Sequence, residues 1–171
     1  MSRIVSTEIV FAQGDEEIIK DCHRIRTDVF HIEQGFPLDT EFDDVEQIAF
    51  HFLLRLTELD PSTGETTTKS VGTIRGTTPG VYPSNNRYKL SRLAVDKDYR
   101  KYKFGRLLVE KLHKWIQEDA KLTNRPAEVE CHSQIPVMGF YAKFGYTPEG
   151  EEFDEDGEPH QNMVVRLSLS E

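Results

Sequence analysis

Cysteine is among the residues that this sequence has least of, with only Cys22 and Cys131 among 171 residues. Two cysteines cannot build a disulfide-rich scaffold, so we expect a chain that folds in a reducing compartment, cytoplasmic or nuclear. Cys22 falls on the apolar stripe of a predicted helix, where free cysteine usually packs as a small hydrophobe. We therefore interpret it as a core residue and not as a nucleophile.

Long apolar runs are missing as well. No stretch is apolar over the roughly 20 residues that a membrane-spanning helix needs, and the first residues lack the pattern of a signal peptide. We therefore expect no association with a membrane.

Positive charge is the third shortage. Lys and Arg number 21 against 30 Asp and Glu, which gives a net charge of −9 at pH 7. Nucleic-acid-binding domains need a basic face, so nucleic acid is not an expected partner. A cationic small molecule or a basic peptide fits the charge, although net charge constrains a substrate only weakly.

The residues that are present predict an ordinary globular chain, expected to form one domain over residues 1–171. Strand–helix alternation after residue 89, preceded by a meander, predicts a mixed α/β sheet. Gly72 and Gly76 predict a close backbone approach or a bulge in their strand. The expected strands are residues 4–11, 49–56, 70–78, 90–95, 127–132, 147–153 and 162–169, and the expected helices are residues 15–32, 105–122 and 135–143.

A basic turn lies between the strand at 90–95 and the long helix that follows it. Arg100, Lys101, Lys103 and Arg106 crowd together there with no acid among them. Cations at a helix N-terminus oppose the helix dipole by roughly 0.3–1 kcal/mol each, whereas an anion is favoured there. The turn therefore indicates a site for a multiply negative group such as a pyrophosphate. From charge alone, a solvated basic loop is an equally good interpretation.

An acidic loop follows the first helix. Its acids are Glu41, Asp43, Asp44 and Glu46. Their spacing matches no calcium-binding loop, because the required glycine and terminal glutamate are not in register. We expect no metal, and a solvated or substrate-facing loop instead.

The segment LSRLAVDKDYRKYKFGRLLVEKL resembles the acetyl-CoA-binding segment of the GNAT superfamily of N-acyltransferases. Arg100 and Gly105 match the family's Arg/Gln-x-x-Gly-x-Gly/Ala pattern, and Lys103 stands where its first glycine is usual. A second, independent match is Gln134-x6-Tyr141-x3-Gly145-Tyr146, which is similar to the family's C-terminal motif of Asn, Tyr, Gly and Phe at the same spacing.

A third match narrows the resemblance. VFHIEQGFP, the acidic loop, AFHFLL and EPHQNM together look like the ElaA/YjcF-like branch of the superfamily. In that branch Glu33, Gln34, His51 and His160 would have counterparts.

The resemblance implies a GNAT-like fold, a central, mostly antiparallel twisted sheet flanked by helices, with acetyl-CoA as co-substrate. Backbone N–H groups from Tyr102 to Arg106 would grip the pyrophosphate, and the strand edge at Leu93 and Val95 would pair with the pantetheine amides. The N–H of Leu93 would also polarise the thioester carbonyl. The residues expected to bind acetyl-CoA are Leu93, Ala94, Val95, Arg100, Lys101, Tyr102, Lys103, Phe104, Gly105, Arg106, Gln134 and Tyr141.

Tyr141 is the expected general acid, because a phenol keeps its proton at neutral pH and can give it to a departing thiolate. The alternative is that its ring simply packs beneath the cofactor. Glu33 is the first candidate for the general base and His51 the second.

Three further residues are candidates for the base. These are Glu130, His132 and His160. Glu130 and His132 share one face of a strand, so Glu130 could orient the imidazole. Cys131 points to the opposite face, so it cannot form a Cys–His pair with His132.

The expected function is therefore an N-acetyltransferase that moves an acetyl group directly to a primary amine in a ternary complex. A small amine is the expected acceptor, and loops 33–47, 79–86 and 153–160 would shape its pocket. Homodimers are common in this superfamily. A non-catalytic acyl-CoA-binding module or an interaction domain remains the alternative.

Overall fold

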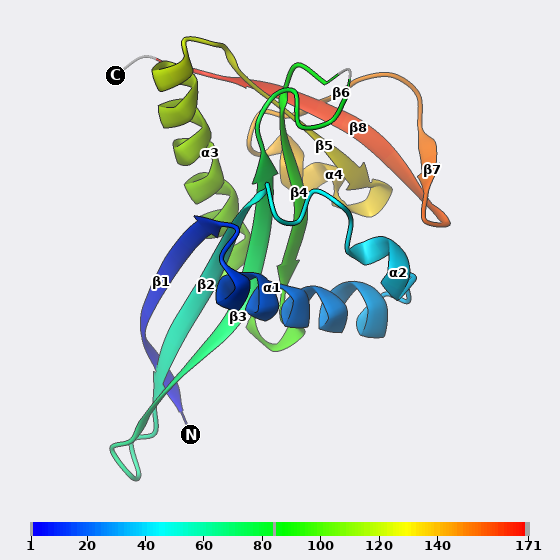
Figure 1. Ribbon diagram of the computed structural model, residues 1–171. Helices are drawn as coiled ribbons and strands as arrows, with labels where there is room; N and C mark the ends of the chain where they lie inside the picture. Colours follow the sequence, from blue (N-terminus) through cyan, green and yellow to red (C-terminus); the bar gives the residue numbers. More distant parts are fainter. Residues whose placement is uncertain (1, 84, 170–171) are drawn as a thin grey trace. The chain divides into compact units, whose positions relative to one another are not determined.

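The computed structural model describes residues 2–83 and 85–169, with Asp39 and Thr40 described for their backbone alone (Figure 1). Ser84, within the loop at 79–86, and the ends of the domain expected over 1–171 lie outside the described residues. The chain forms two compact units. The first is Met1–Arg75 with Arg92–Lys111, and the second is Gly76–Ser91 with Leu112–Glu171.

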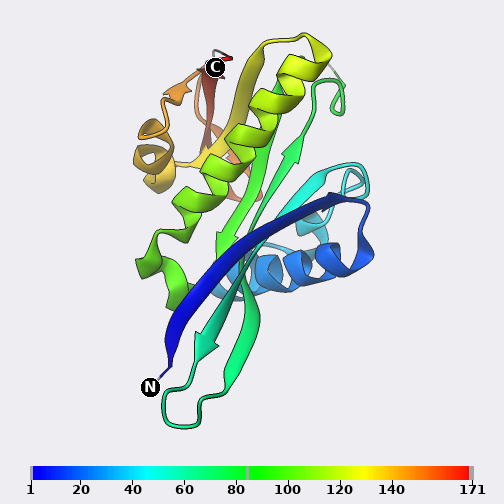
Figure 2. The same ribbon diagram turned by 90° about the vertical axis from the view of Figure 1, so that its left-hand side faces the viewer.

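The first unit contains the amino-terminal meander and the start of the long helix. Its elements are β1 (Arg3–Gln13), α1 (Glu16–Arg26), η1 (Thr27–Glu33), α2 (Leu38–Glu41), β2 (Phe50–Leu59), most of β3 (Thr66–Thr77), the end of β4 (Tyr88–Val95), η2 (Lys97–Tyr102) and the start of α3 (Phe104–Thr123). The strand order is β1-β2-β3-β4. β1 runs antiparallel to β2, and α1 lies across β2 and β3 on one face (Figures 1 and 2).

Helix α1 begins where the sequence predicts. Asp15 caps it by accepting hydrogen bonds from the N–H groups of Glu17 and Ile18. Cys22 and Ile25 of the predicted stripe are fully buried. Ile32 is not part of this face, since its exposed fraction is 71%. The helix widens into the π-helix η1 after Arg26, and the changed periodicity turns Ile32 out of the stripe.

The second unit contains the carboxy-terminal strands and the short helices between them. Its elements are the ends of β3 and α3, the start of β4, β5 (Ala127–Gln134), η3 (Ile135–Val137), α4 (Met138–Ala142), β6 (Thr147–Pro148), β7 (Phe153–Glu155) and β8 (Glu158–Leu167). The order is β4-β5-β8-β6, with β7 on β8. β4 pairs with β5 in parallel over three residue pairs, Tyr88↔Val129 to Leu90↔Cys131.

The strand expected at residues 147–153 is wrong in extent. The structure has two short strands there, β6 and β7, which both pair with β8. Gly150 separates them with a positive φ of 77°, a conformation that breaks an extended backbone. The last strand also begins earlier than expected, at Glu158.

The two strand glycines have the predicted role of allowing a close approach. A Cβ at Gly72 would lie 3.0 Å from Cδ1 of Leu108, and a Cβ at Gly76 would lie 2.6 Å from Cδ1 of Leu112. Both leucines are fully buried on α3. The mixed α/β sheet flanked by helices is thus confirmed. No helix of the described residues combines the length and the apolar character needed to cross a bilayer.

Candidate active site

The basic turn of the first unit is built by η2 and the start of α3. Lys103 ends η2 in the left-handed conformation, with φ 61° and ψ 33°. Phe104, the first residue of α3, is buried and stacks on Tyr102 with ring centroids 5.5 Å apart. The φ and ψ of Lys103 are those that glycine adopts freely, and for a residue with a Cβ they cost about 1–2 kcal/mol.

The start of α3 offers backbone donors to an anion. The first N–H groups of a helix have no intrahelical acceptor, and the first turn of α3 contains no acidic residue. Lys101, Lys103 and Arg106 are exposed beside it. These features suit the binding of a phosphate or pyrophosphate.

Two of the four cations have carboxylate partners, which come from outside the turn. Arg100 holds Glu33 through Nη1–Oε2 and Nη2–Oε1 distances of 2.6 and 2.7 Å, and its Nε donates to the carbonyl of Val95. Arg106 Nε lies 3.1 Å from Oε2 of Glu110, one turn further along α3. The fold brings Glu33 in from η1, which spacing along the sequence did not indicate.

The ion pair affects Glu33 as a candidate base. The hydrogen bonds from Arg100 lower the pKa of the Glu33 carboxyl below its ordinary value. A carboxylate with a lowered pKa accepts a proton less readily. The structure therefore brings Glu33 to the expected phosphate site as the partner of Arg100.

The backbone of β4 changes direction at Arg92, which has a positive φ of 55°. Its Nε donates to the carbonyl oxygen of Glu41, the last residue of α2, at 3.1 Å. Leu93 is half-buried, and Ala94 and Val95 are buried. A non-glycine residue with positive φ inside a strand is a strained feature of the kind found at functional sites.

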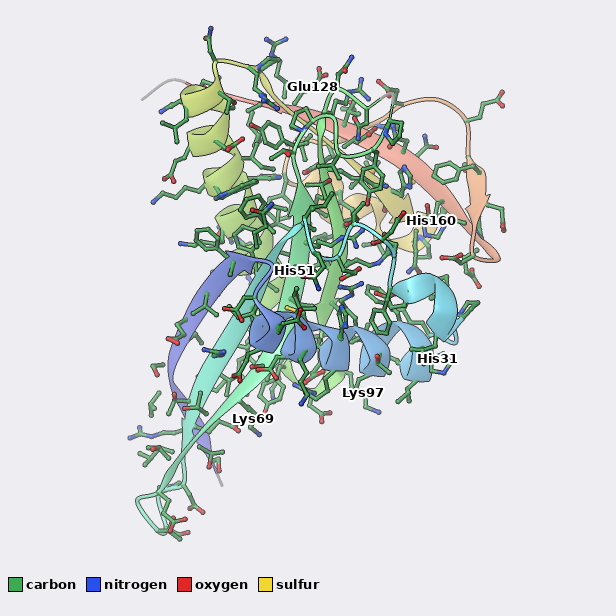
Figure 3. All side chains as sticks on the ribbon, viewed as in Figure 1. His31, His51, Lys69, Lys97, Glu128 and His160 are labelled. Atoms are coloured by element: carbon green, nitrogen blue, oxygen red, sulfur yellow. The ribbon has the colours of Figure 1, made fainter. Side chains whose placement is uncertain are left out.

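The second base candidate, His51, is fully enclosed in the first unit. Its side chain has no exposed surface, and its Nε2 lies 2.7 Å from the carbonyl of Glu46. Nδ1 is buried without a hydrogen-bond partner among the described residues. Burial lowers the pKa of the imidazole, which favours the neutral form. His51, labelled in Figure 3, is thus not placed to meet a substrate in this structure.

Glu41 and Glu46 of the acidic loop are buried, so the expectation of a solvated loop is wrong for these two residues, whereas Asp44 is exposed. Glu46 accepts from Arg26 at 2.8 Å and from Arg75 at 2.6 Å. Arg26 also reaches Glu41 at 2.7 Å. The arginines come from α1 and β3, elements far from the loop in sequence. Among the described residues no group of three or more His, Cys, Asp or Glu side chains is arranged to hold a metal ion.

Tyr141 lies in the second unit on α4. Its side chain is 7% exposed, and its ring meets Phe140 and Tyr146 edge-on at 5.2 and 5.6 Å. Burial, followed by the nearby Cys131, raises the pKa of the phenol well above its ordinary value. The hydroxyl therefore stays protonated at neutral pH, but burial also makes it a weaker acid.

The remaining motif residues have clear structural roles. Gly145 has a φ of 92° and ends the segment after α4. Tyr146, where the motif usually has Phe, is buried, and its hydroxyl lies 2.8 Å from Nε2 of His113 on α3. Gln134 is half-buried at the end of β5, opposite His160 of β8.

The structure adds one residue that sequence reasoning missed. Glu155 of β7 has its Oε1 2.7 Å from Nδ1 of His132 and its Oε2 3.7 Å from Nε2 of His160. Glu130, the orienting residue expected from the sequence, pairs with Arg87 instead, at 3.5 Å. Asp156-Gly157, a two-residue hairpin turn, is the signal that could have located Glu155.

Comparison with known proteins places this geometry in a family. The family model described as an acetyltransferase (GNAT) domain matches residues 65–167, more than half of the chain. The uncharacterised N-acetyltransferase YjcF of Bacillus subtilis (strain 168) is 29% identical over 151 residues, which cover 88% of this chain and 94% of that protein.

Two solved structures have a similar fold. Escherichia coli ElaA superposes with a TM-score of 0.70 at 21% identity, covering 93% of this chain and 99% of that one. An acyl-CoA N-acyltransferase from Pseudomonas aeruginosa gives a TM-score of 0.69 at 18% identity, with 92% and 98% covered. The resemblance to the branch of ElaA and YjcF is confirmed. The chain belongs to the GNAT acetyltransferase family and is an acyltransferase.

Proposed function

We propose that this acyltransferase is an acetyl-CoA-dependent N-acetyltransferase that passes the acetyl group directly to a small primary amine in a ternary complex. The observation that carries the proposal is the exposed basic turn, in which Lys103, at the position where the family's first glycine is usual, is left-handed just before α3. The left-handed conformation costs a lysine free energy. We interpret this cost as arising because the turn must present its backbone N–H groups to a diphosphate.

The turn supplies binding of the co-substrate. Backbone N–H groups from Tyr102 to Arg106 hold the diphosphate oxygens, and Lys101 and Lys103 add charge from the exposed side. Arg100 joins them when its contact with Glu33 is exchanged for one with phosphate. Since Arg100 and Glu33 are both partly exposed, this exchange costs little.

The end of β4 supplies orientation. Leu93 to Val95 follow the turned residue Arg92, so their backbone groups are offered to the pantetheine amides. The N–H of Leu93 polarises the thioester carbonyl and stabilises the negative charge that develops on its oxygen.

Tyr141 supplies a proton to the departing thiolate. The buried phenol of α4 is fully protonated at neutral pH, as a general acid must be. Gln134 at the end of β5 belongs to the same motif and completes the expected binding residues.

A second function, acyl-CoA binding without catalysis, is favoured by a specific observation. The pKa of Tyr141 is raised by burial, which makes proton transfer to a thiolate less favourable. A sensor of acyl-CoA would need the basic turn but not this transfer.

Incubation with acetyl-CoA and a panel of primary amines, analysed by mass spectrometry, separates the two. The expected result is an acetylated amine formed in proportion to enzyme. Calorimetry with CoA measures binding in parallel. Binding without any acetylated product across the panel would support the non-catalytic function, and the absence of CoA binding would overturn both.

A further inference from the structure

A histidine–carboxylate pair lies in the second unit, whereas the expected bases Glu33 and His51 belong to the first. His132 of β5 and Glu155 of β7 are joined at 2.7 Å through Nδ1 and Oε1. We propose that His132 is the general base that takes a proton from the acceptor amine, and that Glu155 positions and polarises it. This inference rests on the proposed transferase function and assigns a further residue to the same reaction.

The hairpin of β7 and β8 fixes the carboxylate. Asp156 and Gly157 both have positive φ, 55° and 87°, as a type I′ turn requires. The turn sets Glu155 opposite Glu158. β8 continues antiparallel to β5, where His132 pairs with Asn162. Hydrogen-bonded strands therefore hold both members of the pair, which limits their motion.

The contact also selects the reactive nitrogen. Nδ1 donates its hydrogen to Glu155, so Nε2 is the nitrogen that can accept a proton. Within the described part of the chain, the ring's hydrogen bond is the one through Nδ1. The side chain of His132 is 29% exposed, so solvent or a substrate can reach it.

Glu155 is ionised at neutral pH. Burial works to raise its pKa, but the hydrogen bond from His132 and the charges of His132, His160 and Lys89 outweigh burial and lower the pKa below its ordinary value. An ionised carboxylate on Nδ1 fixes the tautomer and stabilises the imidazolium that forms on proton transfer. Phe153 packs its ring against His132 at 5.0 Å and limits rotation of the imidazole.

The other titratable groups around His132 have their own partners. On the same strand face, Glu130 lies 3.5 Å from Arg87 and 3.4 Å from the amide of Asn162. From β8, His160 is 5% exposed, and its Nδ1 bonds the carbonyl of Glu158 at 2.8 Å. Figure 3 labels His160 on this strand.

The candidates of the first unit are less suited to the role. Arg100 engages both carboxylate oxygens of Glu33 and lowers its pKa. His51 has no exposed surface. His132 thus combines an accessible imidazole with an anionic partner, which is the arrangement that a general base requires.

The reaction balances with these groups. The acceptor ammonium gives a proton to Nε2 of His132, leaving a neutral amine. Its nitrogen forms a bond to the thioester carbonyl carbon, the C–S bond breaks, and the electron pair leaves with sulfur. The second proton of that nitrogen passes to water as the neutral amide forms. Tyr141 gives its phenolic proton to the thiolate and regains one from water, and the imidazolium of His132 returns its proton to water.

Three variants test the assignment on the full chain: His132→Gln, Glu155→Gln and, as a matched control at an exposed carboxylate just before β7, Glu152→Gln. Kinetics with acetyl-CoA and the most active amine of the panel are recorded from pH 5 to 9. We expect His132→Gln to lower kcat by about 10²–10⁴-fold. We expect kcat/KM of the wild type to decrease as the pH falls from about 8 to 5, and we call this decrease the acid limb. His132→Gln should remove the acid limb. The dissociation constant for CoA stays unchanged.

Glu155→Gln should lower kcat less and move that limb to lower pH, because the imidazolium loses its anionic neighbour. Glu152→Gln should leave both the rate and the profile unchanged. A merely structural role of the pair would lower activity without moving the limb. If His132→Gln fails to fold by thermal denaturation, the position of the limb in Glu155→Gln decides.

The outcomes separate the two proposals. If the wild type is active and His132→Gln keeps both its acid limb and a kcat within about threefold of the wild type, the base assignment is overturned. The proposed transferase function then still stands. A wild-type chain that acetylates no amine overturns both together.

Discussion

Arg100 and Glu33 are joined by two parallel hydrogen bonds of 2.6 and 2.7 Å, although 67 residues separate them in the sequence. The arginine that matches the family's phosphate-binding pattern is therefore occupied by a carboxylate in this structure. A diphosphate that binds to the turn would have to displace Glu33 before Arg100 could contact it.

The first prediction concerns this exchange. An exposed ion pair contributes about 0–1 kcal/mol, so Glu33→Gln should tighten CoA binding by up to about fivefold. Arg100→Gln should weaken it by about tenfold or more, because a hydrogen bond to a charged group is lost. Titration calorimetry measures both. Arg24→Gln, which opens the exposed ion pair with Asp28, is the control and should bind CoA as the wild type does. Weaker binding in Glu33→Gln would contradict the competition.

The second prediction concerns Tyr141. Replacing it by Phe removes the hydroxyl but keeps the buried ring, so folding should be retained. We expect kcat at saturating substrates to fall by about 10²–10⁴-fold, with little change in CoA affinity. Steady-state kinetics and calorimetry check the two parts. Unchanged turnover would show that the ring only packs, which was the alternative left open by the sequence.

The third prediction concerns the left-handed residue Lys103. Lys103→Gly should stabilise the protein by about 1 kcal/mol relative to Lys103→Ala, because alanine keeps the strained Cβ and glycine does not. Both variants lose the same positive charge and should therefore weaken CoA binding to a similar, modest extent. Urea denaturation and calorimetry are the measurements. Equal stability of the two variants would mean that the backbone at residue 103 carries no strain.

The fourth prediction concerns pH and the buried carboxylate of Glu46. Burial works to raise its pKa, but Arg26, His23 and Arg75 outweigh burial and hold the pKa far below its ordinary value. The unfolded chain, with a Glu pKa near 4.3, therefore takes up this proton first as the pH falls. Stability from Glu46 is fully present above about pH 4.3 and is lost as the pH falls below it.

Glu46→Gln tests this sign. At pH 7 the variant should be less stable by up to about 3–5 kcal/mol, because the buried guanidinium groups of Arg26 and Arg75 each lose one carboxylate partner, although Glu41 and Asp43 still contact them. Its stability should also depend less steeply on pH below about 4.3. Burial raises the pKa of Glu41, so that residue contributes with the opposite sign, and the single variant isolates Glu46. Exposed Asp44→Asn is the control for urea denaturation at each pH and should follow the wild type.

Much of the fold could be predicted from the sequence because periodicity reports burial. The alternation along β5 and the apolar stripe of α1 agree with the prediction, since buried and exposed positions repeat at fixed steps. Ile32 is not on the predicted buried stripe, because no feature of the η1 sequence indicates a change to π-helical spacing. The strand at 147–153 was overextended because pairing with β8, and not propensity, decides where β6 and β7 form.

The candidate site was predicted only where it is local in sequence. The basic turn and the segment from Gln134 to Tyr146 each lie within a short stretch, and motif spacing identified them. The partners of Arg100, Glu46 and His132 come from distant elements, and charge counting along the chain cannot pair them. The burial of His51 could not be predicted from local sequence either, because it depends on which residues α1 and the acidic loop cover.

The burial of the two sulfhydryl groups has a practical consequence for the enzymology. Cys22 and Cys131 are at most 1% exposed, and burial raises the pKa of Cys22 to about 11 and that of Cys131 to about 12. Neither forms an appreciable amount of the nucleophilic thiolate near neutrality. A colorimetric disulfide reagent should therefore report liberated coenzyme against almost no background from the native polypeptide, and no cysteine needs to be blocked or replaced beforehand.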